Sequence, residues 1–232
     1  MINCRETKIL GRNFLKVRRL YLSAFPKIER HDLMELFSAS SKGKAEFLQF
    51  TEDGKFLGLA YVIVRGSVAF LLYFAVDGSR RNRGYGSAIL ETIITKFEGK
   101  DVVLLIESLH ERCDNMDIRI RRKGFYLRNG FRDTGLIQTS FGGEADYEIL
   151  HTEEQFSIES YRYLLAHYPF KSYLEEIRDR ADTRAVPADR HIMEPGDHDA
   201  AESCGRDAEG QELRDEACRR PGAERPCRTS ER

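Results

Sequence analysis

The sequence lacks the features that would place this chain in a membrane or in an oxidising compartment. No apolar run is long enough to cross a bilayer, and Met1 to Leu10 carries charges where a signal peptide would need an apolar core. The five cysteines are an odd number and include no Cys-x-x-Cys pair, so neither a disulfide framework nor a zinc site is indicated. We therefore expect a cytoplasmic chain with free thiols, no membrane association and no bound metal.

A strong charge of one sign is also missing. The formal net charge is -1 over 232 residues, which argues against a dominant polyanion as partner. The basic run from Arg119 to Arg128 is a local exception, but no aromatic platform or repeated basic pattern accompanies it. We therefore expect no nucleic-acid partner. The oligomeric state is left open, and a homodimer is compatible with the sequence.

The C-terminal part, residues 179–232, has no lysine and no aromatic residue but holds four of the six prolines. Such a segment buries too little apolar surface to offset the entropy lost on ordering, so we expect a charged, disordered tail. It is either an acidic interaction tail or a recently acquired or out-of-frame extension. The rest divides into a domain over residues 1–151 and a C-terminal helical extension over 152–178, whose apolar face would pack on the domain.

The pattern of residues 1–151 predicts alternating helices and strands. Apolar positions at helical spacing precede Pro26, and Leu33, Leu36 and Phe37 share one face of a second short helix. The turn at Asp53-Gly54 joins two apolar runs as a hairpin. The remaining elements follow in order: strand 69–76, a loop, a helix up to Gly99, strand 102–106, a helix ending at Asn129-Gly130, and a closing strand pair over 131–140 and 144–151.

The stretch between the third strand and its following helix, Arg80 to Leu90, organises the domain. It reads Arg-Arg-Asn-Arg-Gly-Tyr-Gly-Ser-Ala-Ile-Leu. A helix start leaves backbone N–H groups without partners and carries partial positive charge, so this loop offers an anion a cradle of amide donors. Gly84 and Gly86 would let a phosphate approach the backbone. The alternative is a glycine-containing turn that binds no ligand and whose arginines are solvated.

Two other phosphate-binding loops fail on spacing. No Gly-Lys-Ser/Thr follows for a P-loop, and Gly84-Tyr85-Gly86 is not extended to Gly-x-Gly-x-x-Gly. The stretch instead resembles the acetyl-CoA loop of the GNAT superfamily of N-acetyltransferases, Arg/Gln-x-x-Gly-x-Gly/Ala, through Arg81, Gly84 and Gly86.

A second stretch supports this resemblance. Phe125, Tyr126, Gly130 and Phe131 match the GNAT signature Phe/Leu-Tyr-x-x-x-Gly-Phe, one strand after the loop as the family has it. The chain is thus identified as similar to GNAT N-acetyltransferases of the single-domain bacterial type over residues 3–150. The resemblance implies an α/β (α+β) GNAT fold, with a mixed, mostly antiparallel sheet of six to seven strands flanked by helices.

The resemblance also implies a reaction, the direct transfer of an acetyl group from acetyl-CoA to a primary amine of a small molecule or protein. The pyrophosphate of CoA would be bound at the loop, and the pantetheine arm would pair with the end of the preceding strand, whose backbone would polarise the thioester carbonyl. The CoA-binding residues so implied are Phe74, Ala75, Val76, Arg81, Asn82, Arg83, Gly84, Tyr85, Gly86 and Ser87.

Two side chains are the implied catalytic groups. Tyr126 occupies the family's general-acid position, and a phenol with a pKa near 10 could protonate a departing thiolate of pKa about 8.5. Glu107, at the end of a strand, is the candidate base for the ammonium of the acceptor; it could instead bind a cationic substrate or cap the next helix. Glu29, Glu35 and Glu144 are further acidic candidates for binding an amine.

The chain departs from the family at two positions. Many members carry Asn seven residues before the tyrosine and Ala four before it, where this chain has Arg119 and Arg122. Asn115, one turn earlier, is the candidate to replace the usual pantetheine contact. The basic residues from Arg119 to Lys123 could contact the CoA 3'-phosphate or form a solvated helix face. The rival function is a GNAT-like domain that senses acyl-CoA without turnover.

Overall fold

A computed structural model describes residues 2–109, 115–140, 145–170 and 174–180. The expected Glu144 and the turn at Gly142-Gly143 lie outside the described residues, as do residues 181–232 of the expected tail. The compact unit that contains all described residues is Met1–Pro187. No helix within the described ranges has the length and apolar character needed to cross a membrane.

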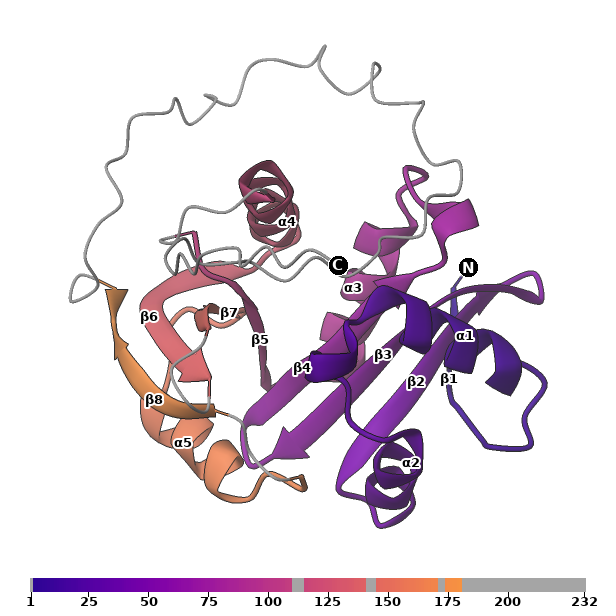
Figure 1. Ribbon diagram of the computed structural model, residues 1–232, viewed down its shortest axis with the longest axis horizontal. Helices are drawn as coiled ribbons and strands as arrows, with labels where there is room; N and C mark the ends of the chain where they lie inside the picture. The colour runs from indigo at the N-terminus through magenta and orange to yellow at the C-terminus, as the bar shows by residue number, and fades with distance from the viewer. Residues whose placement is uncertain (1, 110–114, 141–144, 171–173, 181–232) are drawn as a thin grey trace, which may run out of the picture. The chain divides into compact units, whose positions relative to one another are not determined.

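The described elements form one mixed sheet with helices on both faces (Figure 1). The strands follow the order β1-β2-β3-β4-β5-β7-β6-β8, and only β4 and β5 are parallel. The strands are β1 Asn3–Glu6, β2 Ala45–Glu52, β3 Lys55–Arg65, β4 Val68–Val76, β5 Asp101–Glu107, β6 Arg132–Ser140, β7 Asp146–His151 and β8 Leu174–Asp179. The helices are α1 Phe14–Ala24, α2 Leu33–Ser41, α3 Tyr85–Lys96, α4 Met116–Arg128 and α5 Ile158–Ala166, with 3-10 turns η1 Lys27–Glu29 and η2 Gly78–Arg80.

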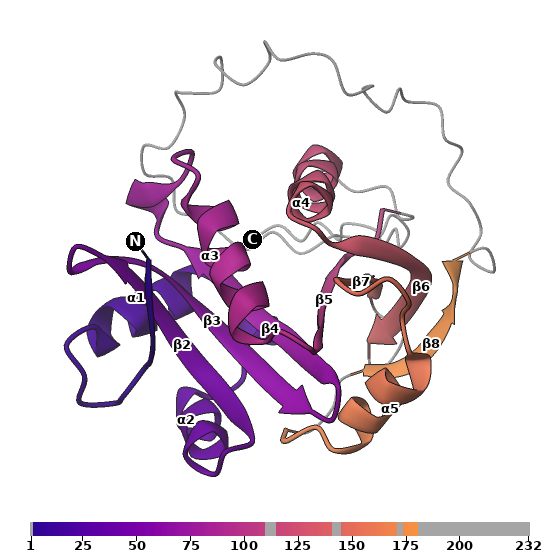
Figure 2. The ribbon, with the colours of Figure 1, turned by 180° about the vertical axis from the view of Figure 1, so that it is seen from behind.

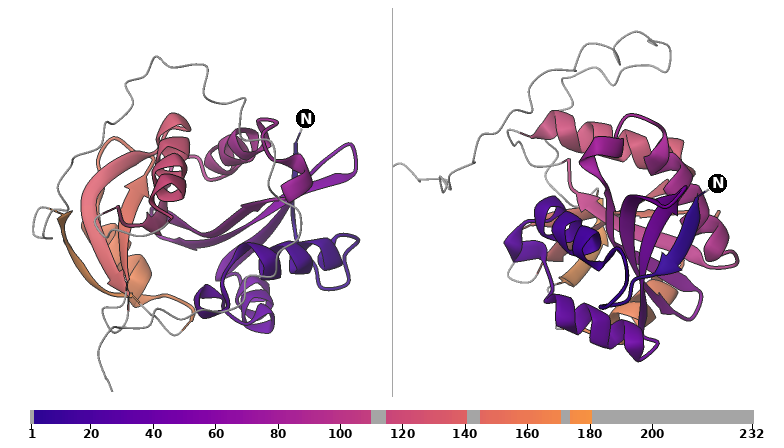
Figure 3. Two further views of the ribbon diagram at one scale, coloured as in Figure 1. Left: turned by 45° about the horizontal axis from the view of Figure 1, so that its top comes forward. Right: turned by 90° about the vertical axis from the view of Figure 1, so that its right-hand side faces the viewer.

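The first two helices lie on one face of the sheet and α3 lies on the other (Figures 1 and 2). Figure 3, left, shows the sheet between α1 and α2 below and α3 and α4 above. Buried side chains form two clusters accordingly: Val17 and Tyr21 of α1 share one with Tyr161 of α5, and Ile89 and Ile93 of α3 belong to the other. The buried positions recur every three or four residues, as the amphipathic pattern predicted.

Local sequence explains several boundaries. The Asp32 side chain accepts a hydrogen bond of 2.7 Å from Met34 N and caps α2. Asp53 and Gly54 have φ angles of 49° and 74°, which suit the tight turn of the predicted β2–β3 hairpin. Gly99 and Gly130 adopt φ angles of 79° and 88° after α3 and α4, as expected for residues that end helices.

The mixed, mostly antiparallel sheet agrees with the expectation and has one strand more than the six to seven expected. The eighth strand, β8, pairs antiparallel with β6 at the edge of the sheet. Residues 174–179, Leu-Glu-Glu-Ile-Arg-Asp, show no alternation of apolar and polar residues. The pairing of an edge strand depends on backbone hydrogen bonds, which leave no mark on the sequence.

A partly buried ion network joins α4 to the closing strands. Lys123 Nζ lies 2.6 Å from Asp133 Oδ2 and 2.7 Å from Glu148 Oε2, and Arg180, just after β8, contacts both carboxylates. The Glu148 side chain is 1 % exposed. Burial opposes ionisation of Asp133, but its hydrogen bonds with Arg180 and Lys123 hold its pKa well below the usual range. The network therefore fixes the helix that carries Tyr126.

Candidate active site

The loop before α3 has the geometry of an anion cradle. Gly84 is the N-cap of α3 and has a φ of 76°, and Asn82 has a φ of 59°. Among the described residues, the backbone N–H groups from Asn82 to Ser87 donate to no protein acceptor; the first N–H bonded within the helix is that of Ala88, to Gly84 O at 3.1 Å. Six consecutive amide donors at a helix N-terminus are thus available to a ligand.

The two glycines of this loop serve different purposes. A Cβ at Gly84 would meet nothing within 4 Å, so its left-handed backbone is what requires glycine. A Cβ at Gly86 would lie 3.1 Å from Cζ of Phe125 on α4. The reason predicted for Gly86, access of a phosphate to the backbone, is therefore incomplete, because close packing of α3 on α4 also requires glycine there.

The side chains of the loop are arranged around the amides. Arg81 and Arg83 are exposed and can neutralise an anion from the solvent side. The Tyr85 hydroxyl donates a hydrogen bond of 2.8 Å to Glu52 Oε2 at the end of β2. Tyr85 contributes its backbone amide to the loop and anchors it to the β2–β3 hairpin.

The strands β4 and β5 separate beside this loop. Their pairing covers only Val68–Phe70 with Asp101–Val103, although β4 continues to Val76 and β5 to Glu107. Phe74, Ala75 and Val76 pair with β3 on one side, and in the described part of the chain no strand pairs with their other side. The gap between the two strands therefore presents backbone groups of β4 to a ligand.

A β-bulge in β4 lies at the point of separation. Tyr61 is opposite Tyr73 and Val62 is opposite Leu71, so Leu72 is an extra residue with no partner in β3. A bulge leaves the extra residue outside the regular ladder and redirects the backbone. The bulge at Leu72 was not predicted, because the run from Val68 to Val76 is continuously apolar and shows no interruption.

Tyr126 lies on α4 beside the gap. Its ring packs edge-on against Phe125 and Phe131, with centroids 5.3 and 5.6 Å apart. Its hydroxyl makes no hydrogen bond to any described residue. Burial raises the pKa of Tyr126 to about 12, and the guanidinium of Arg122 acts in the opposite direction. The phenol is thus a weaker acid than the unperturbed value assumed from sequence.

Glu107 is held by the two arginines that distinguish this chain. Arg119 Nη2 lies 3.3 Å from Glu107 Oε1, and Arg122 Nη1 donates to Glu107 Oε2. Arg119 Nη1 also donates to Ser108 O at 2.8 Å. Asn115 is the N-cap of α4, one turn before Arg119. The predicted base therefore lies between two guanidinium groups.

Groups on the face of α1 and α2 complete the mouth of the gap. Tyr73 of β4 donates to Glu29 O at 2.7 Å and accepts from His31 N at 3.0 Å, which ties η1 to the strand. Desolvation raises the pKa of Glu29; Glu107 raises it further and Arg122 lowers it. Tyr147 is directly opposite Glu107 across β5 and β7, and desolvation, followed by Glu29 and Glu107, raises its pKa.

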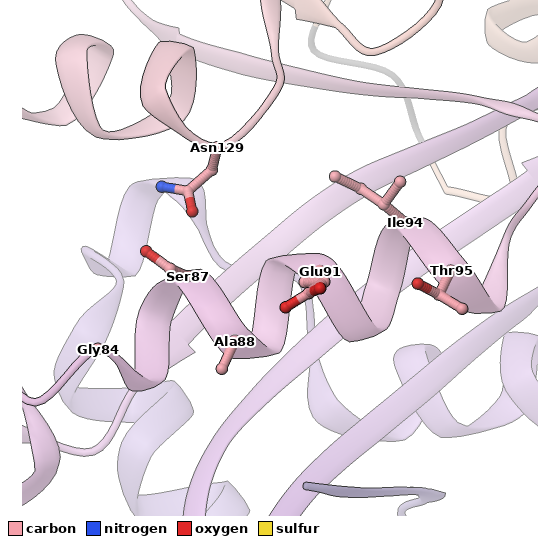
Figure 4. A pocket seen from close by; sticks show the side chains of 7 residues that line it. All are labelled: Gly84, Ser87, Ala88, Glu91, Ile94, Thr95 and Asn129. Carbon is pink, nitrogen blue, oxygen red and sulfur yellow. The ribbon is translucent and has the colours of Figure 1, made fainter. Parts of the chain in front are cut away.

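A pocket of about 450 Å³ continues from the cradle along α3. Figure 4 shows Asn129, at the end of α4, facing Ser87 of α3. The lining residues are Gly84, Ser87, Ala88, Glu91, Ile94, Thr95 and Asn129. Gly84 and Ser87 belong to both the cradle and the pocket, so a ligand bound at the loop can extend into it. Among the described residues, no group of His, Cys, Asp or Glu could hold a metal ion.

Comparison with protein families decides the assignment of this arrangement. The family model of the GNAT acetyltransferases matches residues 14–131, which hold the cradle, the gap and Tyr126. This chain belongs to the GNAT acetyltransferase family. The predicted resemblance and fold are thereby confirmed. No curated protein sequence matches the chain with significance.

Solved structures agree with the GNAT fold. A Bacteroides thetaiotaomicron protein assigned to the GNAT family aligns with a TM-score of 0.60 and 19 % identity, over 71 % of this chain and 94 % of its own. A GNAT-family protein from Desulfovibrio desulfuricans aligns with a TM-score of 0.52 and 21 % identity, over 66 % and 99 %. An aminoglycoside 6'-N-acetyltransferase complexed with coenzyme A gives 0.53 and 11 %, over 67 % and 99 %.

The GNAT site contains residues that sequence reasoning reached only in part. Glu29 was one of three acidic candidates, and nothing in its local pattern set it apart from Glu35. The role of Arg119 and Arg122 as partners of Glu107 was not predicted, although both were recognised as departures from the family. Their spacing of three residues places them on one helix face, which was the available signal.

Proposed function

We propose that this GNAT protein transfers an acetyl group from acetyl-CoA to a primary amine by direct attack. The observation that carries the proposal is the row of unpartnered amides from Asn82 to Ser87 beside the gap between β4 and β5. The coenzyme A bound to the aminoglycoside acetyltransferase of the same fold supports it. The cradle would bind the pyrophosphate, and Arg81 and Arg83 would add charge around it.

The remainder of the donor would follow the surfaces next to the cradle. The unpaired side of Phe74, Ala75 and Val76 would hydrogen-bond the amides of the pantetheine arm as a neighbouring strand would. Asn115 would contact the same arm from α4. The nucleotide end would extend into the pocket between α3 and Asn129. Backbone N–H groups near the bulge at Leu72 would stabilise the oxyanion that forms on the thioester carbonyl.

The chemistry then needs two proton transfers. The neutral amine attacks the thioester carbon, the C–N bond forms, and collapse of the tetrahedral intermediate breaks the C–S bond. Tyr126 donates its proton to the departing sulfur, since its hydroxyl is protonated at neutral pH and has no competing acceptor. The proton of the ammonium goes to a carboxylate at the mouth. Glu29 is the better acceptor, because both oxygens of Glu107 are paired with arginine.

The test is binding of coenzyme A by calorimetry together with thiol release from acetyl-CoA in the presence of amines. We expect coenzyme A to bind the wild-type chain and Gly84→Glu to abolish binding, because a carboxylate would occupy the cradle. Gly99→Glu is the matched control, since Gly99 also has a positive φ but lies at the far end of α3. Retention of affinity in Gly84→Glu would refute the assignment of the donor site.

A specific observation favours a second function, an acyl-CoA sensor without turnover. Glu107 is neutralised by Arg119 and Arg122, and the pKa of Tyr126 lies far above that of a thiol. Tight binding of coenzyme A without thiol release on any amine would support the sensor. Release that depends on an added amine and falls in Tyr126→Phe would support the enzyme.

A further inference from the structure

Four charged side chains at the mouth of the gap balance one another. Glu29 and Glu107 supply two negative charges, and Arg119 and Arg122 supply two positive charges. A site for a polycation would be expected to hold an excess of carboxylates, because each added ammonium must be compensated as it loses water. Two guanidinium groups beside the reacting centre would repel such a ligand.

The arginines have hydrogen-bonding capacity that Glu107 does not use. A guanidinium has five N–H donors. Arg122 directs Nη1 to Glu107, and its side chain is 45 % exposed, so a ligand can reach it from the solvent. Arg119 directs its two terminal nitrogens to Ser108 and Glu107, and its Nε is buried without a partner among the described residues. An anionic group at the mouth would find donors already in position.

A second carboxylate, Glu29, belongs to η1 beside β4. Its backbone is tied to β4 through Tyr73, so η1 is held over the gap. Glu29 itself is solvent-accessible, and it interacts electrostatically with both Glu107 and Arg122. A ligand at the mouth therefore meets a carboxylate that can receive an ammonium group and a guanidinium that can receive an anion.

We propose that the acceptor is an amine that also carries a carboxylate, of the free amino acid class, with its ammonium group at Glu29 and its carboxylate at Arg122. This inference rests on the proposed function and specifies its acceptor. The planar guanidinium of Arg122 can donate two parallel hydrogen bonds to the two oxygens of a carboxylate. The ligand and Glu107 would both bind this guanidinium. Arg119 would hold Glu107 in place and so acts as a positioning residue.

The experiment compares each amino acid with its carboxamide, which keeps the amine and side chain but lacks the carboxylate. Small, apolar and aromatic L-amino acids and their carboxamides are tested with the full chain at saturating acetyl-CoA, with spermidine as a polycation. We expect kcat/KM to be about tenfold or more higher for the best amino acid than for its carboxamide, as for a lost charged hydrogen bond. The amine of a carboxamide is the weaker base, which biases the comparison against the proposal.

Arg122→Gln should remove the preference. It should lower kcat/KM about tenfold more for the amino acid than for its carboxamide, so that the two values become similar. Arg162→Gln, at an exposed position of α5, is the matched control and should keep the preference. Circular dichroism and the affinity for coenzyme A establish that each variant is folded and retains its donor site.

Three kinetic results would overturn the proposal. Equal turnover of amino acids and carboxamides would do so, as would faster turnover of spermidine, or an equal loss for both substrate types in Arg122→Gln. If no amine is acetylated, calorimetry of the same compounds with the coenzyme A complex decides: no binding of amino acids overturns the proposal. If coenzyme A binds in that case, the assignment of the donor site stands. If coenzyme A does not bind, the proposed function is refuted.

Discussion

Phe125 of α4 lies against Gly86 of α3, with the ring Cζ 3.1 Å from the position that a Cβ would take at the glycine. This contact joins the loop that would bind the donor to the helix that carries Tyr126. The spacing between the two sequence motifs thus has a structural basis: the glycine of one makes room for the aromatic residue of the other.

We predict that Gly86→Ala lowers the free energy of unfolding of the wild type but not that of a Phe125→Leu variant. In the wild type, overpacking against the ring costs about 1–3 kcal/mol and outweighs the helix propensity gained, at most about 1 kcal/mol. In a Phe125→Leu background the clash is relieved, so the same change should be neutral or stabilising. Urea unfolding of the four proteins of this double-mutant cycle gives the coupling. A coupling energy near zero would contradict the packing argument.

Tyr126→Phe should slow the chemical step without affecting the fold. The hydroxyl makes no hydrogen bond to described residues, so the free energy of unfolding should change by less than about 0.5 kcal/mol. Loss of a general acid typically costs about 10²-fold or more in kcat. Single-turnover thiol release measures this, and the affinity for coenzyme A is the internal control. An unchanged rate would exclude Tyr126 as the proton donor.

The pH dependence of acetyl transfer should respond to Glu107. Glu29 must be ionised to accept a proton, so kcat/KM should rise with pH through its pKa, which lies above the ordinary glutamate value. Glu107 raises this pKa and Arg122 lowers it, and Arg119 and Tyr147 are further titratable groups next to Glu107. Glu107→Gln should therefore move the acidic limb to lower pH and Arg122→Gln to higher pH. Glu154→Gln, at an exposed loop position, should leave it unmoved.

Stability should fall in acid through Asp133. Arg180 and Lys123 depress the pKa of this carboxyl in the folded state, although burial acts against them. A depressed pKa contributes stability above the unfolded value of about 3.9 and loses it as the pH falls further. Asp133→Asn should cost about 2 kcal/mol at pH 7, because Lys123 and Arg180 each lose a charged partner. Between pH 7 and pH 3, the free energy of unfolding measured in urea should fall less in the variant than in the wild type.

The sequence by itself determined the elements whose patterns are local. Helical spacing in α1 and α3, the Asp53-Gly54 turn, and the glycines after α3 and α4 follow from backbone sterics and side-chain periodicity over a few residues. The loop at Gly84 belongs with them, because a helix N-terminus with glycine offers amide donors wherever it occurs. The motif containing Tyr126 could be read in the same way.

Tertiary structure alone decided what these elements bring together. The bulge at Leu72, the pairing of β8 with β6 and the two arginines on Glu107 depend on strand register and on contacts between residues far apart in the chain. The pKa of Tyr126 likewise depends on its burial and on Arg122. Long-range pairing and desolvation arise from the packed neighbours of a residue, and a linear sequence does not state which neighbours those are.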